Sequence, residues 1–257
     1  MTLTFREAEY VRGITLLNNE LYVMREQAVD QVQVYSTSDF TLLQQLSVPG
    51  LRGKDVEDMT SCEQKQCIYA SDSATTCVHR VGLDRSVSTW PVKGTPRGLS
   101  VTRSSNLLVT CCDWSTVHGK LMLLRSDSGE CAKEITLESH IEYPWHAVQL
   151  NDRQYVVCYG LCDKGQLSQV DADGKVVRSN NGDGGLKYPC HLAVDSNRFV
   201  FVADKRDNRI VLFDPSLNYV RSVVECMQNG PKRLCFDDVT RRLYVGQYDA
   251  MVSVVQL

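Results

Sequence analysis

Short apolar runs separated by polar turns repeat along the whole chain. The clearest copy lies between Tyr188 and Asp214, YPCHLAVDSNRFVFVADKRDNRIVLFD, with apolar runs at Leu192–Val194, Phe199–Ala203 and Ile210–Phe213. A fourth run, Tyr219–Val224, closes the unit. Val, Ile, Phe and Tyr in runs of this length, bounded by Asp, Asn, Gly and Pro, favour strands over helices. The unit therefore predicts four antiparallel strands.

Weaker copies of this unit recur at intervals of roughly 40 to 48 residues from one end of the chain to the other. The first strands of the six copies begin at these triplets: Arg12-Gly13-Ile14, Glu57-Asp58-Met59, Arg97-Gly98-Leu99, Trp145-His146-Ala147, Cys190-His191-Leu192 and Lys232-Arg233-Leu234. A repeat of this length with four strands indicates one blade of a propeller. The sequence thus predicts an all-β protein with a six-bladed β-propeller fold.

The sixth copy is one strand short, because the chain stops at Leu257 soon after the run Val252–Val255. The segment Thr2–Phe5 precedes the first complete copy and has no partner of its own. We expect this N-terminal strand to complete the last blade, which closes the ring and leaves no open sheet edge. Residues 1–257 then form a single propeller domain.

Composition adds little that is specific. A hydrophobic content of 43% is ordinary for a folded domain. There is no apolar run of the ~18 residues that a membrane-spanning helix needs. The first ten residues, MTLTFREAEY, are polar and of mixed charge, unlike a signal peptide. We expect a soluble, cytoplasmic protein, either complete or part of a longer chain.

The eleven cysteines are an odd number and lack the paired spacing of a metal knuckle or a small disulfide scaffold. Four lie in or beside apolar runs and are expected to be small buried hydrophobes: Cys62, Cys67, Cys158 and Cys235. Free thiols of this kind are typical of a reducing compartment. Adjacent Cys111 and Cys112 point to opposite faces of an extended strand, so we expect one of them to be exposed.

The net charge of −3 argues against a broadly basic nucleic-acid-binding domain. In a propeller, the loops before each first strand and between the second and third strands share one face. Here they carry many basic residues: Arg12, Arg25, Lys54, Arg97, Lys205, Arg206, Arg209, Lys232 and Arg233. The same loops carry acidic residues: Glu26, Asp30, Asp55, Asp58, Asp204 and Asp207. This face is either a mixed solvated rim or a sector that binds an acidic peptide or RNA.

Several aromatic residues belong to loops on this face. Aromatic and Arg side chains are the usual anchors of an interface. Tyr143 and Tyr188, which both precede a proline, are expected to pack between blades. Trp114, Trp145 and Arg97 are expected to contact a partner.

His146 and His191 occupy equivalent positions in adjacent blades, with Cys190 beside the second. Two His and a Cys could hold catalytic zinc. The other equivalent positions, however, offer no third His and include a cation: Gly13, Asp58, Gly98 and Arg233. For calcium, Glu57 and Asp58 supply only one corner of the oxygen cage that the ion needs.

The chain also lacks the G-x-S-x-G, P-loop and H-E-x-x-H motifs. We therefore predict no catalytic residues, no bound metal and no cofactor. The two histidines are expected to order the repeated turns or to contribute to a binding face.

The strongest copy resembles the NHL repeat. It has a leading Pro189, an apolar run that ends at Asp195, a central Val202-Ala203-Asp204 and the order Asn208-Arg209-Ile210-Val211-Leu212-Phe213-Asp214. The sixth copy is similar from Gly230-Pro231 through Leu243-Tyr244-Val245. The resemblance implies a six-bladed propeller of the kind found in TRIM-NHL ubiquitin ligases and related scaffolds, which bind protein or RNA on one face.

Together these features predict a non-catalytic scaffold that recognises a protein or peptide partner, as the substrate-binding domain of a ubiquitin ligase would. Binding of single-stranded RNA and a metal-dependent hydrolase or lyase activity are the alternatives. The candidate binding residues are Arg12, Arg97, Trp114, Trp145, His146, His191, Lys205, Arg206, Lys232 and Arg233.

Overall fold

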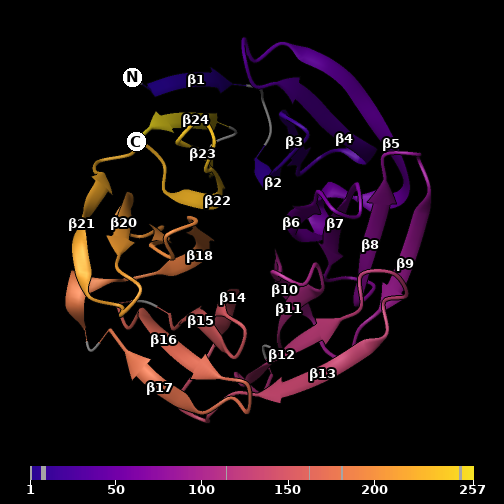
Figure 1. Cartoon of the computed structure of the whole chain (residues 1–257). Coiled ribbons are helices and arrows are strands. Elements are labelled where there is room, and N and C mark those ends of the chain that lie inside the picture. The colour runs from indigo at the N-terminus through magenta and orange to yellow at the C-terminus, as the bar shows by residue number, and fades with distance from the viewer. Residues whose placement is uncertain (1, 7–9, 114, 162, 181, 249–250) are drawn as a thin grey trace.

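Six four-stranded antiparallel sheets form a ring around a central channel (Figure 1). This computed structural model describes residues 2–6, 10–113, 115–161, 163–180, 182–248 and 251–257. Each sheet is one blade, and its strands follow one another from the channel to the rim of the ring. The predicted six-bladed β-propeller is confirmed.

The first blade contains β2 (Val11–Leu17), β3 (Glu20–Arg25), β4 (Val29–Ser36) and β5 (Leu42–Arg52), and the second contains β6 (Val56–Cys62), β7 (Cys67–Asp72), β8 (Cys77–Gly82) and β9 (Val87–Pro91). The third contains β10 (Pro96–Val101), β11 (Leu107–Cys112), β12 (Gly119–Leu124) and β13 (Cys131–Thr136), and the fourth contains β14 (Pro144–Asn151), β15 (Gln154–Tyr159), β16 (Gln166–Asp171) and β17 (Val176–Ser179). The fifth contains β18 (Pro189–Val194), β19 (Val200–Asp204), β20 (Arg209–Phe213) and β21 (Tyr219–Val224), and the sixth contains β22 (Pro231–Asp237), β23 (Arg242–Gln247), β24 (Met251–Gln256) and β1 (Thr2–Arg6). Two short 3₁₀ helices, η1 (Gly53–Asp55) and η2 (Asp183–Gly185), lie in the connections. Within the described residues, no helix has the length and apolar character to cross a membrane.

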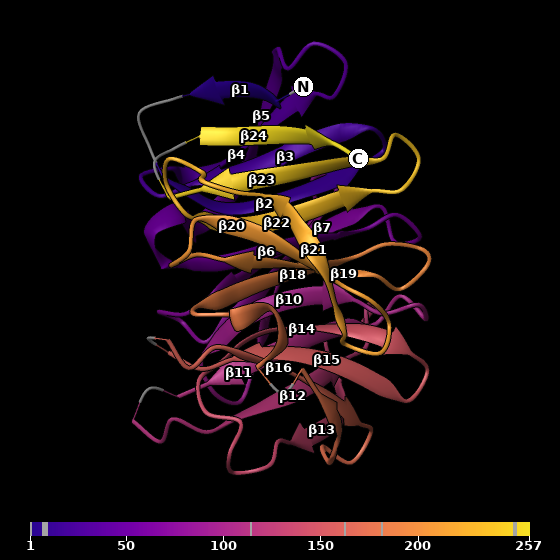
Figure 2. The same cartoon turned by 90° about the vertical axis from the view of Figure 1, so that its left-hand side faces the viewer.

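The N-terminal strand closes the ring as predicted. β1 pairs with β24 in antiparallel register, with Thr2 opposite Val255 and Phe5 opposite Val252. Figures 1 and 2 show β1 beside β24 at the outer edge of the sixth blade. The last blade is therefore built from both ends of the sequence, and β24 does not present an unpaired edge.

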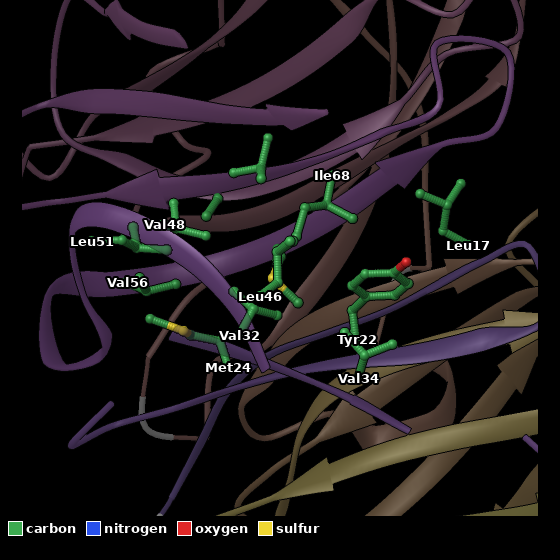
Figure 3. Packing of buried hydrophobic residues seen from close by; sticks show 13 residues of the cluster. Leu17, Tyr22, Met24, Val32, Val34, Leu46, Val48, Leu51, Val56 and Ile68 are labelled. Atoms are coloured by element: carbon green, nitrogen blue, oxygen red, sulfur yellow. The ribbon is translucent and has the colours of Figure 1, made fainter. Parts of the chain in front are cut away.

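The hydrophobic core lies between neighbouring blades. Figure 3 shows one such layer, in which Leu17 and Tyr22 of the first blade pack with Val56 and Ile68 of the second. Alternate side chains of a strand point to opposite faces of its sheet. Each blade therefore buries both faces against its neighbours, and every fully buried aliphatic side chain contributes about 1.5–3 kcal/mol.

This packing corrects the expectation for the paired cysteines. Cys111 and Cys112 do point to opposite sides of β11, but both are buried, with 2% and 4% exposure. A second strand is covered on both faces by the adjoining blades, so neither side of it is open to solvent. Cys62, Cys67 and Cys158 are buried as predicted, whereas Cys235 is half-buried.

Every inner strand carries a β-bulge at the same place. The register between first and second strands shifts by one residue in all six blades. The extra residues are Arg12, Glu57, Arg97, Trp145, Cys190 and Lys232. A bulge bends the strand and re-aims a side chain. The six bulges thus place two rings of residues at one end of the channel: the extra residues and those that directly follow them.

Candidate functional site

Asp58 of the second blade, which follows a bulge, is the centre of a buried polar cluster in the channel. It is 1% exposed. Its Oδ1 accepts a hydrogen bond from the Met59 amide at 2.8 Å, and its Oδ2 accepts one from the Leu99 amide of the third blade at 2.8 Å. These two amides alone already anchor the carboxylate between two blades.

Three further blades send cationic or ring donors to the same carboxylate. His191 Nε2 lies 3.1 Å from Oδ1 and 3.2 Å from Oδ2. Arg233 Nε lies 3.3 Å from Oδ1, and His146 Nε2 lies 3.4 Å from Oδ2. Arg233 Nε also donates to the Arg12 carbonyl of the first blade at 2.9 Å. All six blades are therefore joined through this one cluster.

The partners of the two imidazoles fix their protonated nitrogens. The Leu234 amide donates to His191 Nδ1 at 3.3 Å, so the proton of a neutral His191 is on Nε2 and faces Asp58. His146 Nε2 lies 3.0 Å from the Leu99 carbonyl and must donate to it. This leaves His146 Nδ1 as an acceptor, and it is buried without a hydrogen-bond partner. The two rings lie against each other with centroids 3.9 Å apart and their planes tilted by 32°.

Two glycines make room for the cluster. A Cβ at Gly98 would lie 2.6 Å from the Trp145 carbonyl oxygen and 2.7 Å from His146 Cδ2. A Cβ at Gly13 would lie 2.5 Å from Met59 Cβ. Real Cβ atoms do not approach so closely, since protein interiors are already close-packed. The first and third blades therefore supply backbone where the other four supply side chains.

The environment sets the charges of the cluster. Burial by itself would raise the pKa of Asp58, but the His191 ring, and after it Arg233, hold that pKa below its ordinary value. Burial, followed by the neighbouring His191, lowers the pKa of His146 to about 3. At neutral pH the cluster therefore combines an ionised Asp58 with a neutral His146.

The same residues offer a possible metal set. One ligand atom each of Asp58, His146 and His191 lies within 4.8 Å of the others. However, the Arg233 guanidinium contacts Asp58, and two amides and His191 already use the carboxylate lone pairs. Zinc would have to displace these donors while a cation remains beside it. The geometry favours a self-contained ion-pair cluster.

Cys190, the third zinc candidate from the sequence, faces away from this cluster. Its Sγ is directed toward the backbone carbonyls of Pro231 at 3.4 Å and Ala203 at 3.6 Å. Burial raises the pKa of this thiol to about 11, which disfavours the thiolate form that binds metal. The absence of a metal stays a prediction, to be checked by elemental analysis.

Beside the cluster, a small basic pocket opens at the end of the channel where the inner strands begin. Its volume is about 50 Å³, and its lining residues include Arg97, Trp145, Tyr188, Lys205 and Lys232. We call this site the mouth pocket. Its other lining residues are Glu57, Asp58, Gly98, Cys190, His191 and Arg233.

The two lysines of the mouth pocket lie against aromatic rings. Lys205 Nζ is 4.1 Å from the ring centroid of Tyr248 and 5.6 Å from that of Tyr188. Lys232 Nζ is 6.0 Å from the Tyr248 centroid. Neither lysine forms an ion pair with a described carboxylate. Burial, followed by Arg233 and Arg12, lowers the pKa of Lys232 to about 7.

Four of the other cations predicted for this face, Arg12, Arg97, Arg206 and Arg209, have acidic partners. Arg12 pairs with Glu26. Arg97 Nη1 lies 2.9 Å from Glu57 Oε1. Arg206 Nη2 lies 3.3 Å from Asp163 Oδ2, and Arg206 does not line the mouth pocket. Arg209 Nη2 lies 3.1 Å from Asp204 Oδ2.

Of the two tryptophans predicted to contact a partner, one lines the mouth pocket and the other lies outside the described residues. Trp145 is partly exposed, donates from Nε1 to the Gly160 carbonyl at 3.1 Å, and packs edge-on against Tyr188 with centroids 5.2 Å apart. Tyr188, which we expected only to pack between blades, also lines the pocket. Trp114 lies outside the described residues.

These features define a β-propeller with a buried charge cluster across its channel. No family model matches the chain, and no curated protein matches it in sequence. Among solved structures it is similar to virginiamycin B lyase from Staphylococcus aureus, with a TM-score of 0.71 and 9% identity over 100% of this chain and 99% of that chain. It is also similar to hydrazine synthase of Kuenenia stuttgartiensis (TM-score 0.70, 12% identity, 96% of this chain and 83% of that one).

A third similar structure is the WD40 β-propeller domain of Doa1, with a TM-score of 0.67 and 13% identity over 99% of this chain and 94% of that chain. Identities this low show a shared propeller fold alone. The NHL resemblance remains a prediction from the repeat motif.

Proposed function

We propose that this propeller is a non-catalytic binding module that recognises an acidic segment of a protein or peptide partner at the mouth pocket. The observation that carries the proposal is the pair Lys205 and Lys232. Both ammonium groups line one pocket, and neither has a carboxylate partner among the described residues. Trp145, Tyr188 and Tyr248 surround them with the aromatic surface that interfaces favour.

The electrostatics of the pocket support an anionic occupant. Burial of Lys232 beside Arg233 and Arg12 disfavours its charged form, which is why its pKa falls to about 7. A carboxylate in the pocket would favour that charge again through short charge-assisted hydrogen bonds. The pocket volume of about 50 Å³ suits a small group such as the side-chain carboxylate of Asp or Glu.

RNA is the second candidate, since stacked bases could use the same aromatic rings. A phosphate backbone, however, needs a row of available cations. Arg12, Arg97, Arg206 and Arg209 are paired with carboxylates, which weakens such a row. The proposed role therefore favours a peptide, in keeping with the substrate-binding part of a ubiquitin ligase that the NHL resemblance implies.

The proposal includes a reducing compartment such as the cytoplasm. The ten described cysteines are free thiols, and eight of them are fully or partly buried within blades: Cys62, Cys67, Cys77, Cys111, Cys112, Cys158, Cys190 and Cys235. Thiols of this kind persist where the cell keeps cysteine reduced.

Reversing both lysine charges is expected to weaken peptide binding. We expect the double variant Lys205→Glu, Lys232→Glu to lose about tenfold or more of its affinity for a fluorescein-labelled oligoglutamate peptide, because charge-assisted hydrogen bonds contribute about 1.5–3 kcal/mol each. Fluorescence anisotropy measures the dissociation constant. Arg153→Glu, an exposed charge reversal in the β14–β15 hairpin at the other end of the channel, is the matched control and should bind as the parent does.

Equal peptide affinity for the parent and the folded double variant would contradict the proposal. Labelled oligouridylate is measured in parallel at several salt concentrations. Tighter binding of this RNA, with affinity that falls steeply as salt rises, would establish the RNA alternative instead.

A further inference from the structure

The amine of Lys232 lies in the mouth pocket without a counter-charge. Its side chain is half-buried there, and the two carboxylates that line the same pocket are both bound to arginines. Glu57 Oε1 lies 2.9 Å from Arg97 Nη1, and Asp58 Oδ1 lies 3.3 Å from Arg233 Nε. Within the described residues, no carboxylate is therefore left to balance a protonated Lys232.

The closest charges to this amine are positive. Arg233 follows Lys232 in the chain, and its Nη1 donates to the Lys232 carbonyl at 2.8 Å. Lys205 lines the same pocket, and Arg12 adds a further cation, itself paired with Glu26. Burial, followed by these like charges, lowers the pKa of Lys232 to about 7. At neutral pH about half of the molecules carry Lys232 as the free amine.

The ring of Tyr248 gives the two lysines of the pocket different roles. Lys205 Nζ lies 4.1 Å from the ring centroid, whereas Lys232 Nζ lies 6.0 Å from it, at the limit of a cation–π contact. The ring therefore stabilises a positive charge on Lys205 more than on Lys232. The pocket thus combines one ammonium group with one amine.

An amine in such surroundings is a nucleophile. Only the unprotonated nitrogen has the lone pair that attacks a carbonyl carbon, and desolvation or a neighbouring cation is the usual way to activate a lysine for imine formation. The adjoining wall offers apolar surface, since Trp145 Nε1 already donates to the Gly160 carbonyl at 3.1 Å. The nearby cation of Lys205 would attract a carboxylate on the same molecule.

We propose that the mouth pocket also binds a small oxo acid covalently, with Lys232 forming a reversible imine at its carbonyl carbon and Lys205 holding its carboxylate. The Lys232 nitrogen forms a bond to the carbonyl carbon. The carbonyl oxygen then leaves as water with the two amine protons, and nothing is oxidised or reduced. A volume of about 50 Å³ admits only an acid of a few carbon atoms. This site shares the pocket with the proposed peptide recognition but does not rest on it.

Trapping the imine in the native protein tests this proposal. Glyoxylate is added together with sodium cyanoborohydride, which reduces the imine to a stable carboxymethyl amine, and peptide mass spectrometry locates the product. At about pH 7.5 we expect Lys232 to be modified about tenfold faster than the exposed Lys175, because an ordinary lysine with a pKa of about 10.4 is almost wholly protonated there.

The pH profile distinguishes an activated amine from one that is merely accessible. The rate of modification at Lys232 should level off above about pH 8, where its amine is mostly unprotonated. Free Nα-acetyllysine, measured in parallel, should react faster up to about pH 10.

The variant Lys205→Met tests how the carboxylate is held. Acetaldehyde forms an imine but has no carboxylate, so it serves as the matched probe. The ratio of glyoxylate to acetaldehyde modification at Lys232 should fall about fivefold or more in the variant, because a charge-assisted contact to the carboxylate is lost.

Three results would overturn the proposal: modification of Lys232 no faster than that of Lys175, a pH profile at Lys232 like that of Nα-acetyllysine, or an unchanged probe ratio in folded Lys205→Met. The first two are measured on the unaltered chain and do not depend on whether a variant folds. The oligoglutamate affinity of the unmodified parent is measured separately, so that failure of the imine site is distinguished from failure of peptide recognition.

Discussion

Asp58→Ala is expected to lower the free energy of unfolding by about 3–5 kcal/mol, the usual result of removing one partner from a buried ion pair. The carboxylate is 1% exposed and contacts Arg233 and His191 from opposite parts of the ring. Without it, the Arg233 guanidinium loses its counter-charge, and the Met59 and Leu99 amides lose their acceptors. Urea unfolding followed by tryptophan fluorescence measures the change.

A surface ion pair provides the control for this experiment. Lys120 and Glu134 lie 2.8 Å apart on neighbouring strands of the third blade, and the Glu134 side chain is 41% exposed. Glu134→Gln should cost less than about 1 kcal/mol. Asp58→Asn, which retains the shape but not the charge, should fall between the two. If Asp58→Ala costs no more than Glu134→Gln, the cluster does not hold the ring together.

The ring itself could be predicted from local sequence patterns. Strand-length apolar runs such as Phe199–Ala203 alternate with turn residues at a constant period, and each run pairs with its neighbour in sequence. The closing strand was also predictable, because the incomplete sixth copy leaves β24 without a partner and Thr2–Phe5 is the one unassigned apolar segment. Local pairing therefore carries most of the fold.

The Asp58 cluster could not be predicted in the same way, because its contacts cross the channel. Asp58 and His191 are 133 positions apart and belong to opposite blades. Aligning the six copies places them in one ring of residues, together with Arg233. From the sequence, Arg233 was interpreted as an obstacle to a metal ligand set. In the structure it is the counter-charge of Asp58.

The basic face was predicted only in outline. The sequence suggests that Arg12 and Arg97 are cations available to a ligand, but in the structure they are paired with Glu26 and Glu57. Ion pairs of this kind depend on side-chain directions after a bulge, which the order of residues does not specify. Only when these ion pairs are known do Lys205 and Lys232 differ from the arginines, as cations without a carboxylate partner among the described residues.

Stability is expected to fall as the pH is lowered from about 6.5 toward 3, because the folded ring holds His146 neutral. The pKa of His146 is lowered to about 3 by burial and by His191, whereas an unfolded His has a pKa of about 6.5. Between these values the unfolded chain binds a proton that the folded chain does not, so falling pH favours unfolding. At pH 5 the expected loss is about 2 kcal/mol relative to neutral pH, at about 1.4 kcal/mol for each pKa unit.

Urea unfolding at a series of pH values measures this slope, and His146→Gln is the matched variant because it cannot take up a proton. The variant should lose most of the decline between pH 6.5 and 4. The charged neighbours of His146 are Asp58 and Arg233, and the His191 ring lies tilted against its own. Because the pKa of Asp58 is held below its ordinary value, its contribution is lost only at lower pH, below about 4. A parent and a His146→Gln variant with the same pH dependence above pH 4 would show that His146 takes up its proton freely in the folded ring.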